Sequence, residues 1–204
     1  MIDTSKILLS NGEMQLVTKT NWILTKRIII DKVNILFGLL ADAMQQQVLT
    51  EKEILPREVI QSTPKIAKGE NYLQLPYVLL DYPRCFDKEN VFAIRTMFWW
   101  GNFFSCTLHL SGSYKMFFQE AIEKNTDALQ KNDLYICNGN DEWHHHFEKS
   151  NYVAAKTLSD EEIIAIFVQQ HFIKVAAKFS LHQWKEIDIL LEKSFSGLLN
   201  LLKY

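Results

Sequence analysis

The sequence has few of the residues that mark secreted or fibrous proteins. Of its 204 residues, only three are cysteine, four are proline and seven are glycine. Cys85, Cys106 and Cys137 are odd in number and widely spaced, which indicates reduced thiols rather than a disulfide framework. The N-terminus lacks the basic segment and following apolar stretch of a secretory signal. We therefore expect a cytoplasmic protein.

An excess of charge of either sign is also absent. The 22 basic and 24 acidic residues give a formal net charge of −2. A broad surface for nucleic acid or anionic membrane would require a basic excess, so neither partner is expected. The phosphate-binding patterns GxxxxGK[ST] and GxGxxG do not occur. With 48% hydrophobic and 23% charged residues, the chain is typical of a soluble globular protein, and we expect one domain over residues 1–204.

The longest stretch without a charged side chain runs from Thr96 to Tyr114. A membrane-spanning helix needs about 20 mostly apolar residues, and glycine, asparagine, histidine and serine interrupt this stretch. The β-branched and aromatic residues of 91–111 favour strands instead. Gly101-Asn102 in the middle predicts a β-hairpin with a two-residue turn.

A two-residue turn fixes which side chains share a face of the hairpin. It sets Thr96 opposite Thr107 and Ile94 opposite His109. One face then combines aromatic side chains with hydroxyls and an imidazole, which is typical of a small-ligand site. The alternative is a half-solvated sheet face whose hydroxyls bond across the strands.

Arg95 is the one charged residue on the opposite, apolar face of the predicted hairpin. A guanidinium keeps its charge, so we expect it to be largely buried beside a carboxylate, with Asp81 the nearest candidate. An anion site is the functional alternative. The candidate ligand-binding residues are Arg95, Thr96, Phe98, Trp100, Ser105, Thr107 and His109.

Three consecutive histidines, His144 to His146, lie inside the chain. In a strand, His144 and His146 would share a face, which suits the HxH spacing of zinc ligands. Glu148, Asp141 or His109 would supply a third ligand. The alternative is a surface or capping role without metal. No cofactor is predicted, and zinc or another divalent ion at His144 and His146 is the exception considered.

Several helices follow from caps and apolar spacing. Ser10 and Glu13 form a capping box before a short helix that ends near Thr18. Apolar residues from Trp22 to Leu49 recur at helical spacing, which predicts a long core helix. Further helices are predicted at 113–130, with Met116, Phe117, Ala121 and Ile122 inward, at about 160–179, and from a cap at Ser180 with Gln183 to the end. Strands are predicted at 76–82 and 134–137, and a polar connector with one helical turn at 50–74.

These elements predict an α+β fold. A small antiparallel meander of three to four strands is covered on one face by helices, chiefly the long N-terminal helix and two C-terminal helices. The last helix is leucine-rich on several sides, which indicates either deep burial or a homodimer interface.

Three segments carry a resemblance: KGENYLQLPY (68–77), DYPR (81–84) and FAIRTMFWWGN (92–102). In these the chain resembles a small group of uncharacterised bacterial proteins of similar length. The resemblance covers most of the chain and implies a bacterial, cytoplasmic protein, but no activity, cofactor or functional residue.

Two functional hypotheses follow. The first is a small-ligand-binding or protein-interaction module without catalysis. The alternative is a metal-dependent enzyme of hydrolase type that uses His144, His146 and His109. No nucleophile–base signature is present, which favours the first.

Overall fold

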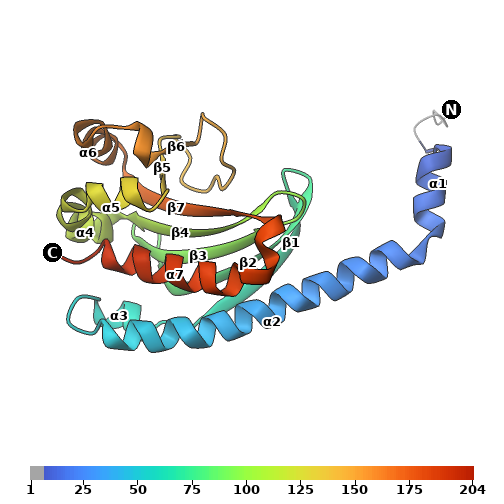
Figure 1. Cartoon of the computed structure of the whole chain (residues 1–204), viewed down its shortest axis with the longest axis horizontal. Coiled ribbons are helices and arrows are strands. Elements are labelled where there is room, and N and C mark those ends of the chain that lie inside the picture. Colours follow the sequence, from blue (N-terminus) through green and yellow to red (C-terminus); the bar gives the residue numbers. More distant parts are fainter. Residues whose placement is uncertain (1–6) are drawn as a thin grey trace.

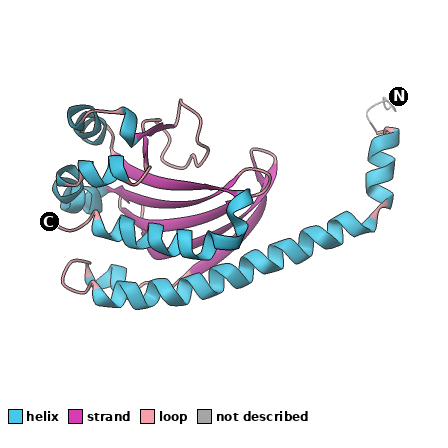
Figure 2. Cartoon of the chain, in the orientation of Figure 1, coloured by secondary structure: helices cyan, strands magenta, loops and turns pink. Residues whose placement is uncertain are grey.

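The structure, a computed structural model, describes residues 7–204. The first six residues, which begin the segment predicted to lack a secretory signal, lie outside the described part. Within it, seven strands form one antiparallel sheet in the order β1-β2-β3-β4-β7-β5-β6 (Figures 1 and 2). The strands are β1 (Lys65–Tyr72), β2 (Leu75–Phe86), β3 (Val91–Trp99), β4 (Phe103–Ser111), β5 (Tyr135–Cys137), β6 (Tyr152–Ala154) and β7 (Phe172–Ser180).

The helices lie mainly on one side of this sheet, which we call the helical face (Figure 2). They are α1 (Asn11–Thr18), α2 (Thr20–Thr50), α3 (Arg57–Ile60), α4 (Gly112–Lys124), α5 (Thr126–Lys131), α6 (Asp160–Gln169) and α7 (Ile187–Asn200), with the 3-10 helices η2 (Ala155–Thr157) and η3 (Leu181–Glu186). None of the helices in residues 7–204 combines the length and apolarity that crossing a bilayer requires.

The main core lies between the helical face and the helices. Phe37 and Met44 of α2, Phe104 and Leu108 of β4, and Phe195 of α7 are all fully buried in it. The α+β class and the long N-terminal helix are therefore confirmed. The leucine-rich tail is buried as well, with Leu198 and Leu201 at 0% and 2% exposure.

The prediction of three to four strands was too low, because three strands were missed: β1, β6 and β7. β7 lies in the middle of the sheet, within the stretch predicted as a helix to Phe179. Six consecutive residues of β7 are buried, so its apolar run has no alternation by which a strand could be recognised. β1 was predicted as connector. It is an edge strand, and its lysines and glycine are the polar, weakly patterned residues that such strands carry.

The hairpin is confirmed, but its predicted register is wrong by one residue. Trp99 pairs with Phe103 and Phe98 with Phe104, so the loop has three residues, 100–102. Gly101 takes a φ of 73°, and the Asn102 side chain donates to the Trp100 carbonyl at 2.9 Å. Three-residue loops are the next most common hairpin connection. The longer loop moves every residue of β4 to the other face relative to β3.

Helix α2 packs on the body from Ile29 and Ile30 onward, which are partly buried against the core. Its fully buried residues begin at Val33 and end at Val48. Trp22 and Ile23 were predicted to join the core, but they are 49% and 38% exposed. The first part of α2 and the whole of α1 extend beyond the sheet (Figure 1). We call residues 7–28 the arm. The predicted capping box of Ser10 and Glu13 at the start of α1 is confirmed.

The predicted inward side of helix α4 is confirmed at Ala121 and Ile122 but wrong at Met116 and Phe117. Phe118, Ala121 and Ile122 are buried, whereas Met116 and Phe117 are 77% and 62% exposed. Because Phe117 and Phe118 are adjacent, two neighbouring sides of the helix each carry a phenylalanine. Composition alone therefore does not predict which side packs on the core. The positions at i, i+3 and i+4 from Phe118 define the face that packs.

These adjacent phenylalanines provide a matched test of the core. We expect Phe118→Ala to lower the free energy of unfolding by about 3–5 kcal/mol, because it leaves a cavity in the core. Phe117→Ala should change it by about 1 kcal/mol or less, since its ring is largely in solvent. Urea denaturation of the two variants measures the difference. Equal losses would show that α4 packs in another orientation.

Candidate functional site

The side of the sheet away from the main core, which we call the outer face, is covered by a loop. Residues 138–151, the covering loop, join β5 to β6 without regular structure. Phe147 of this loop packs edge-on against Phe103 of β4, with ring centroids 5.0 Å apart. Trp143 contacts His109 in the same way at 5.3 Å. The outer face of the hairpin is therefore closed off from solvent over much of its length.

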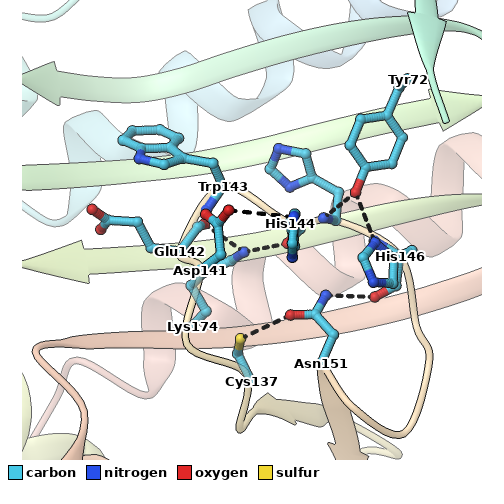
Figure 3. A network of polar contacts seen from close by, with 10 residues as sticks. Tyr72, Cys137, Asp141, Glu142, Trp143, His144, His146, Asn151 and Lys174 are labelled. Carbon is cyan, nitrogen blue, oxygen red and sulfur yellow. Dashed lines mark hydrogen bonds and ion pairs between the residues drawn. The ribbon is translucent and has the colours of Figure 1, made fainter.

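Side chains from two strands, β1 and β7, and one residue at the end of the loop itself hold the covering loop (Figure 3). The Tyr72 hydroxyl accepts the backbone N–H groups of His145 and His146 at 2.6 and 3.2 Å. Lys174 Nζ donates to the carbonyls of Glu142 and His144 at 2.7 and 2.6 Å. At the end of the loop, Asn151 Nδ2 donates to the His146 carbonyl at 2.6 Å. Backbone groups of the loop thus find partners on the sheet.

Arg95 forms the ion pair that the sequence predicts. Its Nε and Nη2 donate to the two carboxylate oxygens of Asp81 at 2.7 and 2.8 Å, which is a bidentate arrangement. The side chains of Arg95 and Asp81 are 17% and 11% exposed. Arg95 Nη1 also lies 2.9 Å from His145 Nε2. Because a guanidinium can only donate, that nitrogen of His145 accepts.

The polar side chains beneath the covering loop form one connected group, which we call the polar cluster: Tyr72, Asp81, Arg95, His109, Glu142, His145, Tyr152 and Lys174. Its two imidazoles, His109 and His145, are kept in the neutral form. Burial lowers the pKa of His145 well below its usual value, and the nearby charges of Lys174 and Arg95 act in the same direction. Burial also lowers the pKa of His109, although its Nε2 lies 2.8 Å from Glu142 Oε2. The hydrogen bond from His109 in turn lowers the pKa of Glu142. A neutral His109 imidazole that donates to the Glu142 carboxylate accounts for the lowered pKa values of both residues.

Among the basic side chains of residues 7–204, Lys174 is the most deeply buried, at 1% exposure. Its hydrogen-bond acceptors are the two loop carbonyls, and its Nζ lies 5.5 Å from the centre of the Tyr152 ring. Burial lowers the pKa of Lys174 to about 8. The buried Tyr152 hydroxyl has no hydrogen-bond partner among the described residues.

The space enclosed by this cluster is very small. It measures about 10 Å³, which is room for no more than a water molecule. Its lining residues are Phe86, Ala93, Arg95, Thr107, His109, His145 and Lys174.

The seven predicted ligand-binding residues do not form one surface. Because of the register change, Thr96 and Phe98 belong to the helical face and lie in the buried hairpin core beside Cys106 and Phe104. Trp100 lies in the hairpin loop. Arg95, Ser105, Thr107 and His109 share the outer face, and all but Ser105 line the small cavity.

Sequence reasoning missed the residues that complete the cluster. Lys174 was not recognised because its strand was predicted as a helix. A lysine inside the apolar run of 172–177 does indicate a buried amine with dedicated polar partners. Tyr72 and Tyr152 were not considered. Their roles depend on contacts between distant segments that no local pattern indicates.

The histidines predicted as metal ligands have other partners. His144 Nε2 lies 3.3 Å from Asp141 Oδ2, and His146 Nδ1 lies 3.1 Å from the Tyr72 hydroxyl. His109 is bonded to Glu142. Within residues 7–204, no three His, Cys, Asp or Glu side chains are arranged to hold a metal ion. The metal site at His144 and His146 stays a prediction without a matching geometry.

Two open hollows lie along α2, away from the cluster. One, of about 630 Å³, lies between the first half of α2 and strands β1 and β2. The other, of about 540 Å³, lies between α2, η3 and the start of α7. The first is lined by Ile23, Lys26, Arg27, Ile30, Asp31, Lys68, Gly69, Glu70, Pro76 and Tyr77.

Comparison with known proteins gives no relative: no family model, no curated protein and no solved structure matches the chain. The resemblance to a group of bacterial proteins therefore stays a prediction.

The Arg95–Asp81 pair allows a direct test of its coupling. Asp81→Leu alone leaves a buried guanidinium without its carboxylate, so we expect a loss of about 3 kcal/mol in unfolding free energy. Arg95→Met should cost a similar amount, and the double variant should lose less than the sum of the two. Chemical denaturation of all three gives the coupling energy. Asp133→Asn, which removes an exposed ion pair with Lys156, is the control and should have little effect. Additive losses would mean that the pair is not formed.

The lowered pKa of Lys174 predicts that the free energy of unfolding depends on pH. Its pKa in the folded state, about 8, lies below the ordinary 10.5. Between these values the folded protein binds fewer protons than the unfolded chain, so stability rises with pH, by at most about 1.4 kcal/mol per unit. Cys137, Asp141, Glu142 and Arg95 also surround the amine, so the comparison is with Lys174→Met. The difference in unfolding free energy, wild type minus variant, should increase between pH 8 and 10. A constant difference would contradict the lowered pKa.

Proposed function

We propose that the protein is a protein-interaction module without catalysis, and that it binds its partner through the arm and the rest of α2. One observation carries the proposal. The arm presents a dense series of large apolar side chains to solvent, and monomeric proteins rarely expose such a continuous apolar surface. The residues, each at least 49% exposed, are Ile7, Leu8, Leu9, Met14, Leu16, Val17, Trp22, Leu24 and Ile28.

The polar cluster favours this proposal over a small-ligand site on the outer face. Its enclosed space of about 10 Å³ is too small for a metabolite. Arg95, Glu142 and Lys174 each have a partner within the protein. The cluster is explained by the need to fix the covering loop, since a loop without regular structure must find partners for its backbone groups.

The hollow beside the arm has the composition of an interface. Ile23, Ile30 and Tyr77 contribute apolar surface to its lining, and Lys68 and Glu70 are among its charged residues. Protein interfaces likewise combine apolar and charged side chains. Its volume of about 630 Å³ is open enough to receive side chains of a partner polypeptide.

Site-specific photo-crosslinking in the native cells tests this proposal. A photoreactive phenylalanine analogue is placed at Leu16 or Leu24, which are 56% and 50% exposed. The control position is Met116, 77% exposed on α4 at the opposite end of the molecule (Figure 1). We expect discrete crosslinked products from both arm positions and none from the control, as measured by denaturing gel and mass spectrometry.

The mass of the product identifies the partner as a second copy or another chain. No product from either arm position, or the same products from Met116, would refute the proposal.

A further inference from the structure

The covering loop is fixed to the sheet by a contact that requires a neutral histidine. His145 Nε2 lies 2.9 Å from Arg95 Nη1. Because a guanidinium can only donate, this ring nitrogen must be unprotonated to accept from it. The backbone N–H of His145 donates to the Tyr72 hydroxyl at 2.6 Å. His145 therefore holds the loop by its side chain and by its backbone.

A proton on His145 Nε2 would turn this contact into a repulsion between two cations. The Arg95 side chain cannot turn away without breaking its bidentate bond to Asp81, at 2.7 and 2.8 Å. It is only 17% exposed, so water screens the two charges incompletely. The covering loop has no regular structure, and it is therefore the part that can move.

Among the described residues around His145, no carboxylate is free to balance a proton on its ring. The titratable and charged groups near it are Tyr72 of β1, Asp81 of β2, Arg95 of β3, His109 of β4, Lys174 of β7, and Glu142 and His144 of the loop. The two carboxylates of this set already bind Arg95 and His109. Burial lowers the pKa of His145 well below its ordinary 6.5, and the charges of Lys174 and Arg95 lower it further. The protonated ring is therefore favoured only once the loop has left the sheet.

We propose that the covering loop is an acid-sensitive lid: protonation of His145 breaks its contact with Arg95, and the loop leaves the outer face while the rest of the fold persists. None of residues 138–151, all of which the structure describes, belongs to the main core. The sheet therefore keeps its helical cover when the lid opens. This inference goes beyond the proposed function, because it concerns the covering loop and not the arm.

Opening the lid exposes an apolar strip of the outer face. Met97, Trp99 and Phe103 are 1%, 6% and 8% exposed in the closed form. Phe147 of the covering loop packs against this group and stacks on Tyr152, with ring centroids 4.5 Å apart. The open form thus presents aromatic side chains that the closed form hides. Acid would in this way change the surface that other molecules can reach.

The pH range of the lid follows from the direction of the pKa shift. His145 has a lowered pKa in the closed form and returns toward its ordinary 6.5 when the open loop is in water. Below pH 6.5 the open form binds more protons, so the ratio of open to closed molecules rises by up to about tenfold per pH unit. Burial lowers the pKa of His109 too, so its release acts in the same direction. Lys174, with a pKa of about 8, stays charged throughout this range.

Hydrogen exchange followed by NMR, in a buffer with a metal chelator, tests the lid. The amides of His145 and His146, which donate to Tyr72, report on the loop. Leu108 of β4, which is paired with strands on both sides, reports on the sheet. Protection of the loop amides, corrected for the intrinsic exchange rate, should fall by about threefold to tenfold per unit from pH 6.5 to about pH 5. Leu108 should stay at least about a hundredfold more protected than the loop amides, because the sheet remains folded.

Two histidine variants separate the trigger from the general effect of acid. In His145→Gln, the amide oxygen can still accept from Arg95 but takes up no proton in this range. Its loop amides should therefore lose at least about threefold less protection per pH unit than those of the wild type. His182→Gln, which replaces an exposed histidine of η3 outside the polar cluster, is the matched control and should follow the wild type.

A wild-type loop whose protection does not change with pH would overturn the lid, and so would an equal loss of protection at Leu108. A His145→Gln variant with the pH dependence of the wild type would overturn His145 as the trigger. If this variant does not fold, NMR titration of the His145 ring in the wild type decides instead. The ring pKa must lie below the ordinary 6.5, and a value at or above it would overturn the coupling.

Discussion

The structure depends on one constraint: strand β4, near the middle of the sheet, is buried along its whole length and on both faces. A sheet buried in this way needs a cover on each side. On the helical face, α2, α4 and α7 provide an apolar cover in the ordinary manner. On the outer face the cover is a loop, and a loop brings unpaired backbone groups to a place where water cannot satisfy them. The polar cluster follows from that, since Tyr72 and Lys174 bind the N–H and C=O groups that the covering loop brings to the sheet.

Because the polar cluster holds the covering loop in place, it contains the residue types of an active site but encloses too little space for a substrate. Buried histidines and a lysine with lowered pKa values are typical of catalytic sites, but structural networks shift pKa values by the same physics. The distinguishing observation is that each strong donor points to a loop carbonyl, a carboxylate or an imidazole of the protein itself. Buried ion pairs contribute little net stability but oppose alternative arrangements strongly. We therefore interpret the Arg95–Asp81 pair as fixing one position of the covering loop.

Sequence reasoning succeeded where a pattern is local and failed where a contact between distant segments decides. The capping boxes at Ser10 and Ser180, the hairpin reversal at Gly101 and the partner of Arg95 all follow from residues close in sequence or in adjacent strands. The register of the hairpin does not follow from such residues. A loop of two or of three residues fits the same Gly-Asn sequence, and only the packing of the strands selects one of them. β7 could not be recognised because burial on both faces removes alternation. The mixed ligand-binding face was an effect of the wrong register, and only Arg95, Ser105, Thr107 and His109 of its residues lie together.

Helix α2 shows why the arm matters for function. An amphipathic helix at the surface of a globular protein needs one apolar side, and α2 has two. The side from Val33 to Val48 is explained by the body of the protein. The second side, formed by Leu24, Ile28, Ile35 and Leu39, has no such explanation within the described residues, because solvent reaches half or more of each side chain. A second apolar side on a helix is the usual sign of a second layer. The same residues that the fold leaves in water are thus those that a second molecule would cover.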